Sequence, residues 1–169
     1  MRRLLAIVIT LALGMVWNAL AMQYRLGCQA SSDHISTHLS YDIAISEDHT
    51  RPAIPDAFRR RHCYGATNSI LLDVRSDDHL MGGEFETEGP VRLKVLPHGT
   101  GPIARIDNIK DFKYLYTTEP HKERVELEWT VEERRPPGLS WYDVRVLQED
   151  GDIAWGSPFW VHLRGTNGQ

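Results

Sequence analysis

The chain has 169 residues, of which 41% are hydrophobic and 25% are charged, and its formal net charge at pH 7 is −4. This length and composition are typical of a globular domain with a substantial buried core. Nucleic acid is not an expected partner, because neutralising a phosphate backbone requires a basic face and the only dense basic run is Arg59–His62. That run is either the solvated end of a short helix or an anion site.

The N-terminus has the pattern of a secretory signal peptide. Two arginines at Arg2 and Arg3 precede an apolar run from Leu4 to Val16, and Ala19-Leu20-Ala21 then has the A-x-A form of a cleavage site. The apolar run is too short for a stable membrane span. A true signal predicts export to the periplasm or the extracellular space; otherwise the protein is expected in the cytoplasm.

Two cysteines, Cys28 and Cys63, complete the inventory of thiols. In an oxidising compartment they could form a disulfide. Alternatively, each is a small buried apolar side chain. The sequence leaves both interpretations open.

The first predicted elements are a strand and a short helix. Leu39, Ile43 and Ile45 alternate as in one strand. Thr50 can cap a helix that contains Pro52 in its first turn and runs to about Arg61. We expect this helix to bury the apolar side chains Ile54, Ala57 and Phe58.

From Ser69 onward the hydrophobic period is two, which predicts strands. A turn is expected at Gly82-Gly83, a loop at Pro97–Pro102, and a hairpin across Glu149–Asp152, where Asp-Gly tolerates positive φ. The expected strands are residues 69–75, 90–96, 103–109, 112–117, 124–132, 141–147 and 153–163. Their number and spacing predict a mainly β fold, specifically an immunoglobulin-like antiparallel β-sandwich.

The β region is rich in aromatic residues, which form either an exposed carbohydrate-binding platform or the core and rim of the sandwich. Trp129 shares a strand face with Val125, Leu127 and Val131, and we expect it in the core. Trp160 faces away from its apolar neighbours and is the best candidate for an exposed aromatic. The set comprises Trp129, Trp141, Tyr142, Trp155, Phe159 and Trp160.

Several segments resemble one protein family. They are Phe58–Thr67 (FRRRHCYGAT), Ile70–Asp73 with Met81–Phe85, and the ending Tyr142–Val146 (YDVRV) with Ala154–Val161 (AWGSPFWV). These segments are similar to a branch of the PHP superfamily, the polymerase and histidinol phosphatase-like metal-dependent hydrolases. The resemblance extends from about Trp17 to His162. In that branch a distorted (β/α) barrel is followed by a C-terminal β-sandwich.

The resemblance implies that the sandwich is preceded by a short α/β remnant of a barrel end. The implied division is a signal-like apolar segment at 1–21, a barrel-terminus remnant with a short helix at 22–66, the β-sandwich at 67–164 and a tail at 165–169. It also offers a second account of Ala19–Ala21, as part of the last barrel helix rather than a cleavage site.

The polar stretch Gln29–His38 (QASSDHISTH) resembles the last metal motif of the family, commonly S-D-x-H. The resemblance implies that Asp33 and His34 are metal ligands, although His34 directly follows Asp33 and Ile35 occupies the usual histidine position. Carboxylate and imidazole suit zinc, manganese or iron, which activate water for attack on phosphorus.

A catalytic metal requires at least three protein ligands, and the earlier motifs of the family are not found in this chain. The remaining histidines have no ligand-like spacing: His62, His79, His98, His121 and His162. We therefore expect no catalytic residues and no cofactor in this chain on its own, and a divalent transition metal only where the full barrel is present.

Three hypotheses for function follow. The first is a non-catalytic accessory β-sandwich whose partner is a PHP-type barrel domain. The second is the C-terminal part of an active metal-dependent phosphoesterase, with Asp33 and His34 completing its site. The third is a secreted sandwich that binds a ligand or glycan through exposed aromatics such as Trp160.

Overall fold

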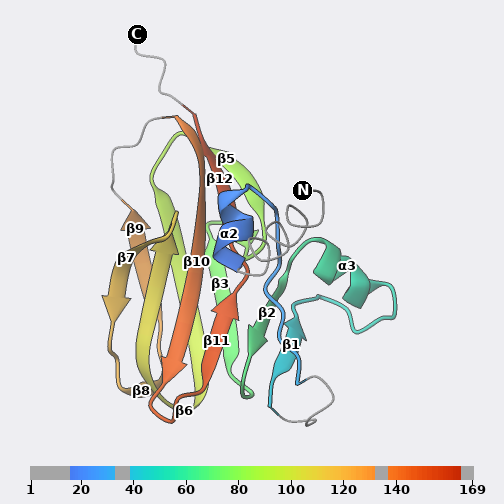
Figure 1. The fold of residues 1–169 in the computed structure, drawn as a ribbon, viewed down its shortest axis with the longest axis vertical. Helices are drawn as coiled ribbons and strands as arrows, with labels where there is room; N and C mark the ends of the chain where they lie inside the picture. The colour runs from blue at the N-terminus through green and yellow to red at the C-terminus, as the bar shows by residue number, and fades with distance from the viewer. Residues whose placement is uncertain (1–15, 33–38, 132–136, 165–169) are drawn as a thin grey trace, which may run out of the picture.

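The computed structural model describes residues 16–32, 39–131 and 137–164 (Figure 1). Its helices within these ranges are α2 (Val16–Ala21) and α3 (Ala53–Arg59). No helix in the described ranges has the length and apolar character needed to cross a membrane. The strands are β1 (Tyr41–Ala44), β2 (Cys63–Ala66), β3 (Leu71–Ser76), β4 (His79–Leu80), β5 (Glu84–Thr87), β6 (Val91–Lys110), β7 (Lys113–Thr118), β8 (Lys122–Arg124), β9 (Leu127–Val131), β10 (Gly138–Gln148), β11 (Ile153–Gly156) and β12 (Phe159–Leu163).

The described strands join into one curled, almost entirely antiparallel sheet, so the predicted mainly β fold is confirmed. The main path through the sheet is β1-β2-β11-β10-β6-β3-β4. The consecutive strands β7, β8 and β9 return along β6, and β12 pairs with β10 on one side. Its other side pairs with β5 in parallel. The predicted hairpin between β10 and β11 is present, with Leu147 opposite Ile153.

The sequence predicts a loop at Pro97–Pro102, and that prediction is wrong because β6 continues through it. Neither proline can donate a backbone hydrogen bond, but both carbonyl oxygens accept one. The Val125 N–H donates to Pro97 at 3.2 Å and the Glu149 N–H donates to Pro102 at 2.9 Å. The register with β8 shifts between His98 and Ile103, so this stretch is an irregular part of a long strand rather than a break.

Gly99 lies in this irregular part of β6, where the chain approaches its neighbours closely. A Cβ atom there would lie 2.4 Å from the Gly101 carbonyl oxygen and 2.5 Å from Gln148 Oε1. The same Gln148 oxygen accepts a hydrogen bond from the Thr100 N–H at 2.8 Å. A glycine at 99 therefore lets β6 pack against the end of β10.

The main core lies on the inner face of the curled sheet. Alternation along β9 and the residues just before it is as predicted, because Val131 is buried and Val125, Leu127 and Trp129 pack, partly buried, against the core. Its fully buried members include Tyr64, Ile70, Val74, Met81, Leu93, Val95, Ile103, Ile106, Tyr142, Val146, Phe159 and Val161.

The outer face of β10 and β12 is covered by residues 16–32, which we call the N-terminal strap. Within it, Leu20 of α2 is 2% exposed and packs in a second cluster with Ile109, Trp141 and Trp160. Figure 1 shows α2 lying over this part of the sheet and the rest of the strap running on toward β2. A helix of six residues is not stable alone, so these contacts hold α2 in place.

Trp160 is 1% exposed, so the prediction that it is an exposed aromatic is wrong. Alternation does place its side chain opposite Phe159 and Val161, as predicted. The strap then covers that second face, which strand alternation could not indicate.

Helix α3 is shorter than predicted, and its burial differs. Ala57 is buried, but Ile54 is 44% exposed, so its predicted burial is wrong. The helix begins after Pro52 without a side-chain cap, and Thr50 contributes only its backbone carbonyl, to the Ala53 N–H at 3.1 Å.

Candidate functional site

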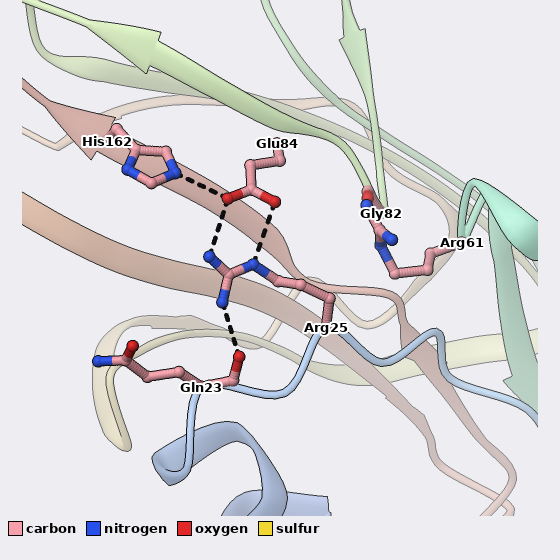
Figure 2. A network of polar contacts seen from close by, with 6 residues as sticks. All are labelled: Gln23, Arg25, Arg61, Gly82, Glu84 and His162. Carbon is pink, nitrogen blue, oxygen red and sulfur yellow. Dashed lines mark hydrogen bonds and ion pairs between the residues drawn. The ribbon is translucent and has the colours of Figure 1, made fainter.

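One polar network joins the strap to two strands through Glu84 (Figure 2). Arg25 of the strap donates from Nε to Glu84 Oε2 at 3.1 Å and from Nη2 to Oε1 at 2.8 Å. His162 of β12 contacts the same Oε1 through Nε2 at 2.7 Å. The hydrogen bonds from Arg25, and then those from His162, lower the pKa of Glu84 to about 2. Glu84 is thus a stable anion that ties three segments together.

Trp160 lies under this network and contacts two guanidinium groups. The Cζ atoms of Arg25 and Arg61 lie 5.6 Å and 5.1 Å from the centre of its ring, within cation–π range. Arg61 also donates from Nε to the Gly82 carbonyl at 3.0 Å. The arginine-rich run after α3 therefore contributes at least one residue to a structural contact rather than to an anion site.

Cys28, farther along the strap, and Cys63 of β2 both lie near Ser157. The Cys28 N–H donates to Ser157 Oγ at 2.8 Å, and that hydroxyl group donates to the Cys63 carbonyl at 2.5 Å. Cys63 Sγ lies 3.7 Å from Ser157 Oγ. Both cysteines are free thiols in the structure. Burial, with smaller effects from Asp143 and Cys63, raises the pKa of Cys28 to about 12, which makes it a poor nucleophile near neutral pH.

A polar cleft of about 640 Å³ adjoins Glu84, between the end of β1, α3 and the β3–β4 hairpin. Several of its charges are paired: Arg60 with Asp56 at 2.8 Å, and Arg75 with Asp73, just outside the lining, at 3.1 Å. The cleft is lined by Ile45, Ser46, Glu47, Asp48, Ala53, Asp56, Ala57, Arg60, His62, Arg75, Asp78, His79, Leu80, Gly83 and Glu84.

His62 and His79, which are 17 positions apart in the sequence, line the same cleft. Burial, and then the charges of Arg60 and Arg61, lower the pKa of His62, so it is neutral at pH 7. Among the described residues, no group of three histidine, cysteine or acidic side chains is placed to hold a metal ion. The cleft offers polar contacts to a small ligand, without an arrangement that identifies a reaction.

The predicted metal ligands Asp33 and His34 lie outside the described residues. Ser32 comes immediately before them in the sequence. Its Oγ accepts hydrogen bonds from the backbone N–H groups of Leu39 at 3.0 Å and Ser40 at 2.8 Å. The other predicted non-ligand histidines have separate partners, because His98 accepts from Arg124 and His121 contacts Glu149.

Sequence patterns did not reveal the network of Figure 2. Arg25 and Glu84 are 59 residues apart, and although Glu84 lies in the Met81–Phe85 segment, no sequence pattern connects the two residues. Glu84 and His162 both lie at partly exposed positions of their strands. Oppositely charged side chains on neighbouring strands stabilise a sheet, so strand alternation together with the pairing of β5 and β12 could have indicated this contact.

No family model matches the chain. Three Chlamydia proteins, described only as uncharacterized, are similar to it. The identity is 29% over 136 residues for the proteins of Chlamydia pneumoniae and Chlamydia trachomatis and 26% for that of Chlamydia muridarum. Each match covers 70% of this chain and 22% of the relative, so the chain spans about a fifth of the length of the relatives it matches.

Among solved structures, the fibronectin(III)-like modules of Clostridium thermocellum CbhA give a weak match. The TM-score is 0.36 at 14% identity, and the match covers 56% of this chain and 98% of the module.

Proposed function

We infer that the chain is a non-catalytic accessory β module, related to PHP-type metal-dependent phosphoesterases, which supports a larger hydrolase domain. The observation that carries this proposal is the strap. Residues 16–32 run across the outer face of the sheet and are fixed there by Leu20 and by the ion pair of Arg25 with Glu84.

The strap contacts the sheet through both apolar and charged side chains, which favours one fixed position of the strap on the sheet. At one end Leu20 and Trp17 pack on an apolar cluster of the sheet. In the middle Arg25 makes a two-pronged contact with Glu84, the geometry in which arginine binds carboxylates best. A segment held in both ways can transmit the position of a partner domain to the sheet.

The finer architecture belongs to the same proposal. We interpret the curled sheet as an immunoglobulin-like sandwich, because residues from both halves of the long strand β6 contribute to one core. We interpret the strap, together with β1 and α3, as the remnant of a barrel end. In this proposal, a preceding barrel would meet the sandwich at the position of the strap.

The relatives support a module within something larger, because the matched region is 22% of each of them. The glycan-binding hypothesis is weakened, since its leading residue, Trp160, is 1% exposed. The phosphoesterase hypothesis depends on Asp33 and His34 together with ligands from a barrel.

The test is the metal content and hydrolase activity of the purified 169-residue chain. After the protein is incubated with zinc, manganese or iron and unbound metal is dialysed away, elemental analysis should find less than one metal ion per chain. The chain should hydrolyse p-nitrophenyl phosphate no faster than buffer alone. One tightly bound metal per chain, with hydrolysis that Asp33→Ala abolishes, would overturn the proposal. The same measurement on Asp48→Ala controls for weak metal binding by exposed carboxylates.

A further inference from the structure

Asp143 is a half-buried residue on the outer face of β10, beneath the strap, and its carboxylate oxygen Oδ1 is fully buried. Trp141 and Arg145, the residues two before and two after it, point to the same side of the strand. Trp141 packs with Leu20 of the strap, and the Arg145 guanidinium lies 6.0 Å from the centre of the Trp17 ring. The strap therefore covers both neighbours of Asp143 on this face.

The polar atoms under the strap are incompletely paired. Within the described part of the chain, Asp143 Oδ1 and Arg145 Nε are buried and have no hydrogen-bond partner. Arg145 does reach the hydroxyl group of Tyr114 through Nη1, at 3.4 Å. A buried carboxylate oxygen without a partner is costly when charged and much less so when the group is protonated.

The groups facing Asp143 come from three elements. On β10 the charge of Arg145 favours its ionised form, and on β6 the charge of Asp107 opposes it. Asp107 is itself held by Arg105 at 2.9 Å. From the strap, Cys28 is close enough for the charge of Asp143 to influence its thiol.

We propose that the N-terminal strap is a pH-dependent latch, which stays closed over Asp143 while that carboxyl group is protonated and opens more often once the group is ionised. Lifting the strap lets water reach the buried oxygen Oδ1, which removes the cost of leaving that charged oxygen without a partner. The proposal concerns the strap and the sheet alone and does not depend on the accessory function.

The direction of the pH dependence follows from Asp143. Burial raises its pKa to about 7 in the closed state, and exposure returns the pKa toward its ordinary value of 3.8. Between these values the open state binds fewer protons than the closed state. Opening therefore becomes about tenfold more favourable from pH 5 to pH 6 and about fivefold more from pH 6 to pH 7, and it levels off above pH 7.

Cys28 reports opening directly, because it belongs to the strap and its backbone is bonded to Ser157 of the sheet. The experiment measures the rate at which dithiodipyridine, which reacts with thiols in acid, modifies Cys28 in the full chain. Digestion and mass spectrometry separate Cys28 from Cys63. The rate is divided by that of the chain unfolded in denaturant at the same pH, which removes the intrinsic pH dependence of the thiol.

The ratio should rise about fiftyfold from pH 5 to pH 7 in the unmodified chain. In Asp143→Asn, which is neutral at every pH, the ratio should not change with pH. Asp73→Asn, a change in an exposed ion pair, should keep the slope of the unmodified chain. A flat ratio in the unmodified chain, or a slope retained in Asp143→Asn, would overturn the latch.

A second measurement avoids reliance on a variant that could fold poorly. Hydrogen exchange of strap amides in the unmodified chain, corrected for intrinsic exchange, should lose protection over the same pH range. Amides in the paired stretches of β6 and β10 should keep theirs. Equal loss in strap and core would indicate global unfolding and contradict a local latch.

Discussion

Glu84 shows how one side chain can join three distant segments. Its carboxylate accepts from Arg25 of the strap and contacts His162 of β12, while its own strand, β5, pairs in parallel with β12. The pKa of Glu84 is lowered from 4.5 to about 2, so the contacts stabilise the folded state where the group is charged. That stabilisation is present above pH 4.5 and is lost as the pH falls toward 2.

We predict that Glu84→Gln lowers the free energy of unfolding at pH 7 by about 1–2 kcal/mol. The pKa shift alone suggests more, but the side chain is 34% exposed and water screens the ion pair. The difference from the unmodified chain should shrink as the pH falls from 4 to 2, because both chains then lack the charge. Urea unfolding followed by tryptophan fluorescence provides the measurement.

The matched control is Glu126→Gln, which removes an exposed partner of Lys94. It should leave the unfolding midpoint almost unchanged, as exposed pairs contribute little. Equal effects of the two substitutions would show that the Glu84 network has no special role.

Among the elements, the turn between β4 and β5 is under a tight steric constraint. Gly82 has φ +84°, and a Cβ atom there would lie 2.0 Å from the Arg61 carbonyl oxygen. The sequence predicted a turn at Gly82-Gly83 from the glycine pair. It did not predict that the turn packs on the end of α3, because that contact spans 21 residues.

We predict that Gly82→Ala destabilises the protein by about 3–5 kcal/mol, since both the backbone conformation and the space exclude a side chain. Gly151→Ala is the control, because Gly151 has φ +92° but no atom within 4 Å of an added Cβ. It should cost only about 1–2 kcal/mol, from the left-handed backbone alone. Thermal unfolding of both variants measures the difference, and similar losses would contradict a steric role for Arg61.

At the scale of the whole molecule, the strap and the sheet form one unit, and we propose that this unit serves a larger assembly. The mass of the chain is 19.3 kDa. In extracts of its own cells, an antibody against the β11–β12 region should detect a native species several times heavier. A denaturing gel then distinguishes a separate 19.3 kDa chain in a complex from the same module within a longer polypeptide.

A native species of 19.3 kDa would contradict the accessory function and would favour a module that works alone. The pH-dependent latch would be unaffected, because it requires only the strap and the sheet. The two proposals can therefore fail independently.

Local sequence patterns were sufficient to predict the elements that have a clear periodicity or a specific turn. Alternation predicted the core face of β9, and Asp150-Gly151 predicted the hairpin between β10 and β11, because side chains on a strand alternate faces and tight turns require particular residues. It also placed Trp160 on the face opposite Phe159.

Long-range contacts determine what covers the second face of the sheet and where the chain bends. The sequence predicted a loop at Pro97–Pro102. Instead, N–H groups from distant residues donate to the carbonyl oxygens of both prolines, and β6 continues. Strand alternation predicted an exposed Trp160. The strap, which lies more than 120 residues before Trp160 in the sequence, covers it. Burial, and with it the raised pKa of Asp143, depends on such long-range contacts, which leave no periodic pattern in the sequence.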